Sequence, residues 1–313
     1  EAVIIPSKYS RHLSFSRDGK RLLYVQTNDQ ANIQGVEFDA LAGNTTGAPF
    51  WITQGDREVS RAELSPDGTK FVMRLTRPTQ DDIVTVTRDG RQWRDLTNDE
   101  PFDRYVRWSP DGKKIAFTSD RNAGGQVWVA NADGSSRMQL TFNASDANPE
   151  AATGFPVWSP DGSRLVVYFN ETTFILDPAR PQTEQTAEIV PRAEPNRFVA
   201  WDWSPDGKNL LGVITGGGTR MLGYYSLETK DYHTVIASPD GIPSWLPDSI
   251  GFVYSEGSKV ILCDINSKQR RELVYDPRID IRSPFVSRDG KLLYYIAANE
   301  ESDIWLLDLS AEK

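Results

Sequence analysis

The chain has 313 residues and a net charge of −9, with a sequence pI of about 4.9. Such an acidic chain lacks the basic face that phosphate contacts need, which excludes nucleic acid as its main partner. The apolar fraction is 38%, and no stretch reaches the roughly 20 apolar residues of a membrane span, so none is predicted.

The first residue is Glu1 rather than a methionine, which indicates a processed or trimmed product and leaves open the removal of a signal peptide or membrane anchor. Cys263 is the single cysteine, so an internal disulfide is excluded. From these features we expect one domain over residues 1–313, in the periplasm or otherwise outside the cytoplasm, with a cytoplasmic location as the alternative.

The tetrapeptide Ser-Pro-Asp-Gly and close variants of it recur seven times, each time between two apolar runs. The steps between successive copies are 49, 44, 50, 45, 42 and 41 residues. A period of forty-odd residues with several short strands per unit predicts a β-propeller. The aspartates of the seven copies are Asp18, Asp67, Asp111, Asp161, Asp206, Asp248 and Asp289.

Residues 104–142 illustrate one predicted blade of four antiparallel strands. Strand A is predicted at 105–108, strand B at 114–118, strand C at 126–130 and strand D at 138–141. Between strands A and B, proline and aspartate suit a type I turn and glycine takes the left-handed residue that follows. The sixth copy has Ser249 in place of this glycine, which predicts an irregular turn.

An aromatic residue precedes the turn in five copies, and we expect these side chains to fill the contact between neighbouring blades rather than to bind a ligand. They are Phe15, Trp108, Trp158, Trp203 and Trp245.

The two chain ends predict how the ring closes. Residues 284–309 supply strands A, B and C of a last blade, with 303–309 as strand C, and residues 2–6 are apolar enough to supply strand D. Such closure removes exposed sheet edges. The predicted fold is therefore an all-β, seven-bladed propeller closed by the N-terminal strand.

The run WSPDGKKIAFTSDR, followed by QVWVANADGSSRMQLT, resembles the PD-type repeats of the TolB-like propeller family, and the closing segment at 289–309 is most similar to sensor-type bacterial propellers. The resemblance implies a periplasmic binding or sensing role. It also leaves open an accessory propeller of an S9-type peptidase or a propeller lyase. The sequence has no G-x-S-x-G motif, so a complete S9 peptidase is excluded.

Enzymatic chemistry has little support in the residues. His12 and His233 are the two histidines and fall in different repeats, and no motif places either beside an activated serine. The turn aspartates lie on separate hairpins and do not converge as Ca²⁺ ligands do. We therefore predict no enzyme activity, no cofactor and no metal.

Arginines recur at the start of strand A. Arg11, Arg104 and Arg282 lie five residues before the turn serine and Arg61 lies four before it, with Arg197 and His12 nearby. Ring closure would bring them to the mouth of the central channel, where arginine binds carboxylates bidentately. The alternative is that they pair with acidic neighbours such as Asp81. Tyr9, Tyr105, Phe155 and Phe198 are candidates for an apolar wall there.

The sequence thus predicts a non-enzymatic scaffold whose D–A and B–C loop face binds a protein segment, a peptide or a small anionic ligand, as part of a bacterial envelope protein.

Overall fold

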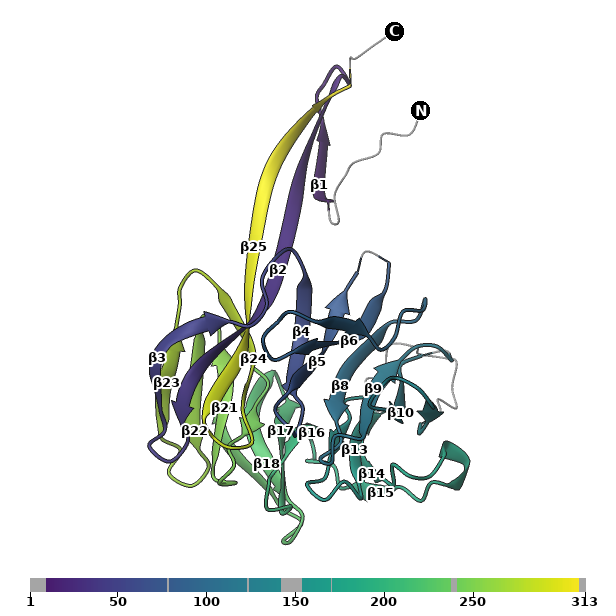
Figure 1. The fold of residues 1–313 in the computed structure, drawn as a ribbon, viewed down its shortest axis with the longest axis vertical. Coiled ribbons are helices and arrows are strands. Elements are labelled where there is room, and N and C mark those ends of the chain that lie inside the picture. Colours follow the sequence, from purple (N-terminus) through teal and green to yellow (C-terminus); the bar gives the residue numbers. More distant parts are fainter. Residues whose placement is uncertain are drawn as a thin grey trace.

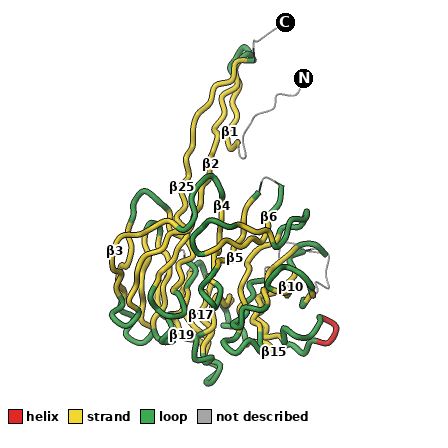
Figure 2. The backbone as a smooth tube through the Cα atoms, viewed as in Figure 1, coloured by secondary structure: helices red, strands yellow, loops and turns green. Residues whose placement is uncertain are grey.

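The computed structural model describes residues 10–77, 79–122, 124–141, 154–169, 171–237 and 241–309. These residues form an all-β fold (Figures 1 and 2), with one short 3₁₀ turn, η2 (Gln182–Glu184). Residues 2–6, expected to form a closing strand, lie outside the described residues.

Four separate sheets each contain four antiparallel strands that follow one another in sequence, and we call them blades 2 to 5. Blade 2 contains β8 (Asp103–Trp108), β9 (Lys114–Ser119), β10 (Gln126–Asn131) and β11 (Met138–Gln139). Blade 3 contains β12 (Val157–Trp158), β13 (Leu165–Phe169), β14 (Thr172–Leu176) and β15 (Glu188–Val190). Blade 4 contains β16 (Arg197–Trp203), β17 (Asn209–Gly216), β18 (Thr219–Ser226) and β19 (Tyr232–Ala237). Blade 5 contains β20 (Ser244–Trp245), β21 (Gly251–Glu256), β22 (Lys259–Asp264) and β23 (Arg270–Tyr275).

A nine-stranded sheet contains two further sets of four strands, blades 1 and 6. A single parallel bridge, Ala31 to Glu58, joins them, and β1 (Ser10–Phe15) adds to β2. Blade 1 contains β4 (Glu58–Leu64), β5 (Lys70–Thr76), β6 (Asp81–Thr87) and β7 (Trp93–Asp95). Blade 6 contains β24 (Asp280–Val286), β25 (Leu292–Asp308), β2 (Arg21–Asp39) and β3 (Asn44–Trp51).

The hydrophobic core is divided into six clusters, each shared by two consecutive blades. Blades 1 and 2, 2 and 3, 3 and 4, 4 and 5, 5 and 6, and 6 and 1 each share one cluster. The contacts therefore run in a complete circle through the described blades. The expected role of the aromatic residue before the turn is confirmed for Trp108, Trp158, Trp203 and Trp245, which are 3–8% exposed, but is wrong for Phe15, which is 64% exposed.

The six turn tetrapeptides that begin with serine form the same hydrogen bonds. In blade 3, Ser159 Oγ donates to Asp161 Oδ1 and accepts from the backbone N–H of Arg164, while Gly162 has a φ of +72°. The expectation of an irregular sixth turn is wrong. Ser249 adopts a φ of +60° and donates its N–H to the Leu246 carbonyl, as glycine does in the other turns.

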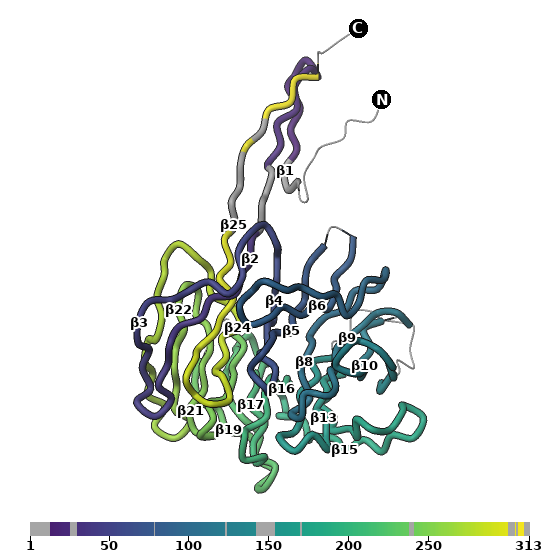
Figure 3. The backbone as a smooth tube through the Cα atoms, in the orientation of Figure 1, coloured from purple at the N-terminus to yellow at the C-terminus, as the bar shows by residue number. Residues whose placement is uncertain are grey.

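The expected seven blades are not formed among the described residues, which make six. The first turn copy joins β1 to β2 outside the ring, and β2 is not folded into a strand B and a strand C. Instead β2 pairs with β25 along 17 successive positions, from Arg21 opposite Asp308 to Glu37 opposite Leu292. In Figure 3 these two strands leave the ring together.

Blade 6 is consequently a hybrid of both ends of the chain. β24 and the first half of β25 are its strands A and B, while the second half of β2 and β3 are its strands C and D. Residues 303–308, expected as strand C of the last blade, pair with residues 21–26 in the projecting part. The physical reason is that residues 21–26 can pair with either of two antiparallel partners that alternate apolar residues in the same way. One partner is the second half of β2 and the other is the end of β25.

Candidate functional site

The inner strand of several blades contains a bulge that positions side chains in the channel. The registers of β4, β8, β16 and β24 shift near the middle of each strand. Arg61, Tyr105 and Ser283 lie at these shifts and have φ values of +54°, +56° and +48°. A bulge re-aims a side chain, and left-handed non-glycine residues are costly unless the surroundings impose them. Three consecutive blades therefore place strained residues at one depth.

The channel contains two cavities with a narrow void between them. The cavity at the A–B turns has a volume of about 780 Å³ and is lined by the turn prolines and their tryptophans. The cavity on the D–A and B–C loop face has a volume of about 530 Å³. The void, of about 30 Å³, shares Arg61 and Ser283 with the second cavity and Glu63 and Arg107 with the first.

We call the 530 Å³ cavity the arginine cavity, because four arginines and one carboxylate, that of Asp280, line it. Arg104 Nε lies 2.6 Å from Asp81, whose carboxylate also lies 3.5 Å from Arg74. Arg282 Nε lies 2.6 Å from Asp280. The carboxylates of Asp81 and Asp280 thus pair with three guanidinium groups, those of Arg74, Arg104 and Arg282. The fourth arginine, Arg61, has neither carboxylate within ion-pairing distance.

Arg61 lies against aromatic rings instead of a carboxylate. Its guanidinium carbon lies 4.2 Å from the ring centroid of Trp201, 5.0 Å from that of Tyr105 and 5.8 Å from that of Phe155. Burial, with a smaller contribution from the neighbouring Arg107, lowers the pKa of Arg61 to about 9. No carboxylate of the described residues lies within 4.0 Å of it. Cation–π contacts compensate only part of the cost of removing a cation from water.

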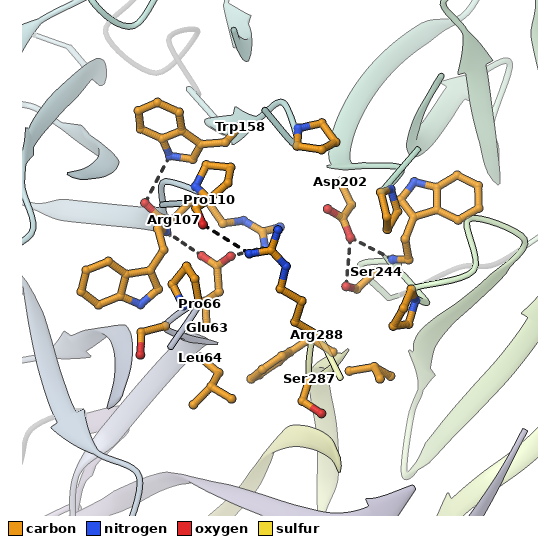
Figure 4. Close-up of a pocket in the computed structure, with 18 of the residues that line it drawn as sticks. Glu63, Leu64, Pro66, Arg107, Pro110, Trp158, Asp202, Ser244, Ser287 and Arg288 are labelled. Carbon is orange, nitrogen blue, oxygen red and sulfur yellow. Dashed lines mark hydrogen bonds and ion pairs between the residues drawn. The ribbon is translucent and has the colours of Figure 1, made fainter. Parts of the chain in front are cut away.

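Glu63, Arg107 and Asp202 are charged residues that line the 780 Å³ cavity (Figure 4). Arg107 donates from Nη2 to the Trp201 carbonyl at 2.6 Å and lies 3.9 Å from Glu63. Asp202 accepts hydrogen bonds from Ser244 Oγ at 3.0 Å and from the Trp245 N–H at 2.8 Å. Burial raises the pKa of Glu63 to about 7 and raises that of Asp202.

Arg288 extends from the last turn into the 780 Å³ cavity (Figure 4) and donates to the carbonyl of Pro110 at 3.3 Å. This contact links blade 6 with blade 2 across the opening. Arg288 thus partly covers the mouth of the 780 Å³ cavity. Arg61, Arg104 and Arg282, which the sequence predicted at the channel mouth, line the cavity on the opposite face.

The structure brings together three of the predicted site residues: Arg61, Arg104 and Arg282 line one cavity. Arg197 is not among the residues that line it, and pairs with Glu171 at 2.7 Å on the exposed side of blade 4. The structure therefore does not bring Arg197 together with Arg61, Arg104 and Arg282. The side chains of Arg11 and His12 lie outside the described residues.

The predicted apolar wall is present in part. Tyr105 lines the arginine cavity, and Phe155 packs between Tyr105 and Trp201, with ring centroids 4.4 and 4.1 Å apart. Phe198 is instead buried in the cluster between blades 3 and 4. Tyr9 lies outside the described residues.

The sequence analysis missed Arg74, Glu63 and Asp202. Glu63 and Asp202 share a detectable signal, since each lies two residues before a turn serine, as Arg107 does. Arg74 lies on strand β5 with no repeated counterpart, so pattern alone gave no signal for it. Within the described residues, no three His, Cys, Asp or Glu side chains gather as a metal site would require. No described helix has the length and apolar character needed to cross a membrane.

A family model for the TolB beta propeller domain matches residues 12–190, more than half of the chain. The chain belongs to this family. The Tol-Pal system protein TolB of Wolinella succinogenes is 26% identical over 197 residues, which are 60% of this chain and 44% of that protein. An uncharacterized peptidase of Bacillus subtilis, YuxL, is 27% identical over 211 residues, or 63% of this chain and 29% of the peptidase.

Among solved structures, a putative TolB from Agrobacterium tumefaciens superimposes with a TM-score of 0.65 at 15% identity, over 86% of this chain and 98% of that one. This likeness shows a TolB-like propeller fold. The chain spans less than half the length of the two curated relatives named above.

Proposed function

We propose that this TolB-family propeller is a non-enzymatic binding module that holds an acidic peptide segment or a small anionic ligand in the arginine cavity. The observation that carries the proposal is Arg61, a partly buried cation that contacts aromatic rings and no described carboxylate. A cation partly removed from water is stabilised by pairing, so an anion from outside the described chain would complete the site.

The cavity has the size and lining of a ligand site. Its volume of about 530 Å³ falls within the range of about 300–1,000 Å³ that small-molecule sites occupy. Four arginines at one depth repel one another, and Asp81 and Asp280 offset only part of this charge. The remaining positive potential favours a carboxylate-bearing segment, while Tyr105 supplies an apolar surface for it.

The partner we propose is an extended segment of another protein of the bacterial envelope, with the chain in the periplasm. Support comes from family membership and from the TolB of Wolinella succinogenes among its relatives. The alternative of a small free anion shares the same chemistry.

The test is binding of a fluorescein-labelled peptide of four glutamates, followed by fluorescence anisotropy at low salt. We expect Arg61→Ala to weaken binding about tenfold, since it removes a charge-assisted contact. Arg197→Ala is the matched control, because it removes an arginine outside the cavity. Equal affinity of Arg61→Ala and wild type would contradict the proposal. Binding of free glutamate as tightly as of the peptide would favour the small anion.

A second candidate function is an accessory propeller of a hydrolase, favoured by the relative named as an uncharacterized peptidase, of which this chain matches 29%. Expression of the complete natural polypeptide, followed by assay with aminoacyl p-nitroanilides, tests it. Hydrolysis that depends on a domain outside residues 1–313 would support this candidate.

A further inference from the structure

The part of the chain that projects from the ring has the strands of a blade but buries fewer of its apolar side chains. We call this part the ribbon: β1, residues 21–29 of β2 and residues 300–308 of β25. Figure 1 shows it standing away from the blades. It leaves the ring where other blades have their B–C turns, the face on which Gly257 of one such turn lines the arginine cavity.

Several apolar side chains on the ribbon are exposed although their repeat counterparts are buried, whereas Leu22 and Tyr24 on its central strand are 3% and 6% exposed. Phe15 is 64% exposed, whereas the tryptophans at its position in blades 2 to 5 are at most 8% exposed. Leu23 is 43% exposed, whereas its counterparts Val72, Ala116, Val166 and Leu211 are 0% exposed. Leu13, Ile304 and Leu306 are 57%, 73% and 60% exposed. Exposed apolar residues so concentrated indicate a surface that packs against something.

Hydrogen bonds that recur in other blades show which blade strand each half of β2 corresponds to. The Ile33 N–H donates to Thr53 Oγ1 at 2.9 Å, and Ile83 with Thr97 and Val127 with Thr141 repeat this bond at the same distance. Residues 30–39 are therefore a strand C, as β6 and β10 are. Ser16 and Asp18 form the usual A–B turn bond at 2.6 Å, so β1 and residues 21–26 are a strand A and a strand B.

One exchange of partners would convert the ribbon into a blade. At present Tyr294 lies opposite Gly35, and Leu23 lies opposite Leu306. In blade 2 the equivalent residues, Ala116 and Val129, pair within one B–C hairpin. The corresponding hairpins here would pair Leu23 with Gly35 and Tyr294 with Leu306. The pairings β1–β2, β2–β3 and β24–β25 would all be kept.

The sequence at the two crossing points suits the turns that such hairpins need. Residues 27–30 read Thr-Asn-Asp-Gln and residues 299–302 read Asn-Glu-Glu-Ser, four consecutive polar residues near the middle of each strand. Asn, Asp and Ser favour turns because their side chains bond to nearby backbone groups. We propose that the protein has a second form in which the ribbon folds back between blades 6 and 1 as a seventh blade of the same chain.

This fold-back would also change the arginine cavity, a consequence that rests on the proposed function. As an inner strand, β1 would carry Arg11 at the position that Arg104 and Arg282 have in their strands, five residues before the turn serine. Arg11 would then become a further anion-binding residue. Because an acidic peptide would bind the folded-back form more tightly than the ribbon form, it would shift the equilibrium toward the folded-back form.

Two pairs of cysteines distinguish the forms, in a Cys263→Ala background that removes the native thiol. Arg21 and Glu37 are 16 positions apart on β2, about 50 Å along an extended strand, which no disulfide can bridge. In the folded-back form they would lie opposite each other, as Lys114 and Asn131 do in blade 2. A disulfide between Arg21→Cys and Asp308→Cys indicates the ribbon form, because these two residues lie opposite each other in it.

We expect Arg21→Cys with Glu37→Cys to form an intramolecular disulfide on mild oxidation of the monomer, measured without peptide by non-reducing electrophoresis and mass spectrometry. Crosslinking of Arg21→Cys with Asp308→Cys alone would overturn the proposal. A disulfide of Arg21→Cys with Glu37→Cys found only between two molecules would also overturn it, in favour of strand exchange between copies.

A second measurement does not depend on oxidation. Leu306→Asp buries a carboxylate if the ribbon folds back and leaves it in water if it does not, so we expect a clear loss of thermal stability. Leu41→Asp is the control, because Leu41 is 100% exposed. Equal melting temperatures of both variants would contradict the fold-back.

Peptide affinity then tests the role of Arg11. The oxidised Arg21→Cys, Glu37→Cys protein should bind the tetraglutamate peptide about fivefold more tightly than its reduced form, and Arg11→Ala should abolish this gain. Disulfide formation without any change in affinity would overturn the role of Arg11. Equal affinity of Arg61→Ala and wild type for the peptide would instead contradict the proposed function, and the disulfide results would still decide the fold-back.

Discussion

Glu63 of blade 1 accepts a hydrogen bond from the backbone N–H of Trp108 in blade 2 at 2.8 Å. Asp202 of blade 4 accepts one from the N–H of Trp245 in blade 5, also at 2.8 Å. Both carboxylates lie two residues before the serine of their own turn. Each accepts from the residue that directly precedes the turn tetrapeptide of the next blade. A carboxylate inside the channel thus links neighbouring inner strands whose backbone groups would otherwise lack a partner.

We predict that Glu63→Gln reduces the loss of stability between pH 5 and pH 8. Burial raises the pKa of Glu63 from 4.5 to about 7, so the folded state holds a proton that the unfolded state has released. Stability therefore falls as pH rises from about 4.5 to about 7. Glutamine keeps an acceptor for Trp108 and does not ionise.

Urea unfolding at the two pH values measures this difference, with Glu228→Gln on the surface as control. Identical pH dependence of Glu63→Gln and wild type would show that Glu63 ionises normally in the folded protein.

We predict that Asp161→Ala lowers the free energy of unfolding at pH 7 by roughly 1 kcal/mol, because solvent screening at this exposed turn reduces the roughly 1.5–3 kcal/mol of a hydrogen bond to a charged group. Asp161 accepts bonds from Ser159 Oγ and from the N–H and Oγ of Ser163, which lower its pKa to about 2. The stabilisation is present above the unfolded pKa of about 3.8 and is lost as pH falls through about 2.

Denaturant unfolding from pH 7 down to pH 2 follows this effect, and the variant and wild type should converge at the acid end. Asp56→Ala, in an exposed loop, is the control. A constant difference at every pH would mean that the charge of Asp161 has no part in the turn.

We predict that Arg104→Ala and Arg282→Ala both weaken binding of the tetraglutamate peptide, by threefold to tenfold, but differ in stability. Arg104 bonds to Asp81, which is 4% exposed, so its removal leaves a buried carboxylate with Arg74 alone at 3.5 Å. Arg282 pairs with Asp280 at the exposed rim, where ion pairs contribute little. Anisotropy and thermal melting of both variants check this, and equal melting temperatures would argue against a structural role for Arg104.

We predict that the isolated chain hydrolyses neither peptides nor esters. The described residues contain no metal-binding cluster, and the sequence has two histidines in separate repeats and no nucleophile motif. Incubation with p-nitrophenyl acetate and a casein digest, followed by absorbance and mass spectrometry, measures turnover. Activity that a single substitution in this chain removes would refute the prediction.

Local sequence patterns were sufficient to predict the hairpins, the arginines at the start of strand A and the propeller family. A serine, an aspartate and a left-handed glycine bond only to their immediate neighbours, so the turn around Asp161 is readable from six residues. The recurrence of arginine five or four residues before the turn serine placed Arg61, Arg104 and Arg282 in one cavity, because repeated strands begin at the same depth.

The number of blades and the strand that pairs with residues 21–29 depend instead on contacts between distant parts of the chain. Leu23 carries the same apolar pattern whether its partner is Gly35 in its own hairpin or Leu306 from the far end of the chain. Strand alternation specifies a face and a register but not the identity of the partner, and the choice depends on the closure of the whole ring. The pairing of Arg104 with Asp81 was likewise set by the contact between blades 1 and 2, which no local pattern encodes.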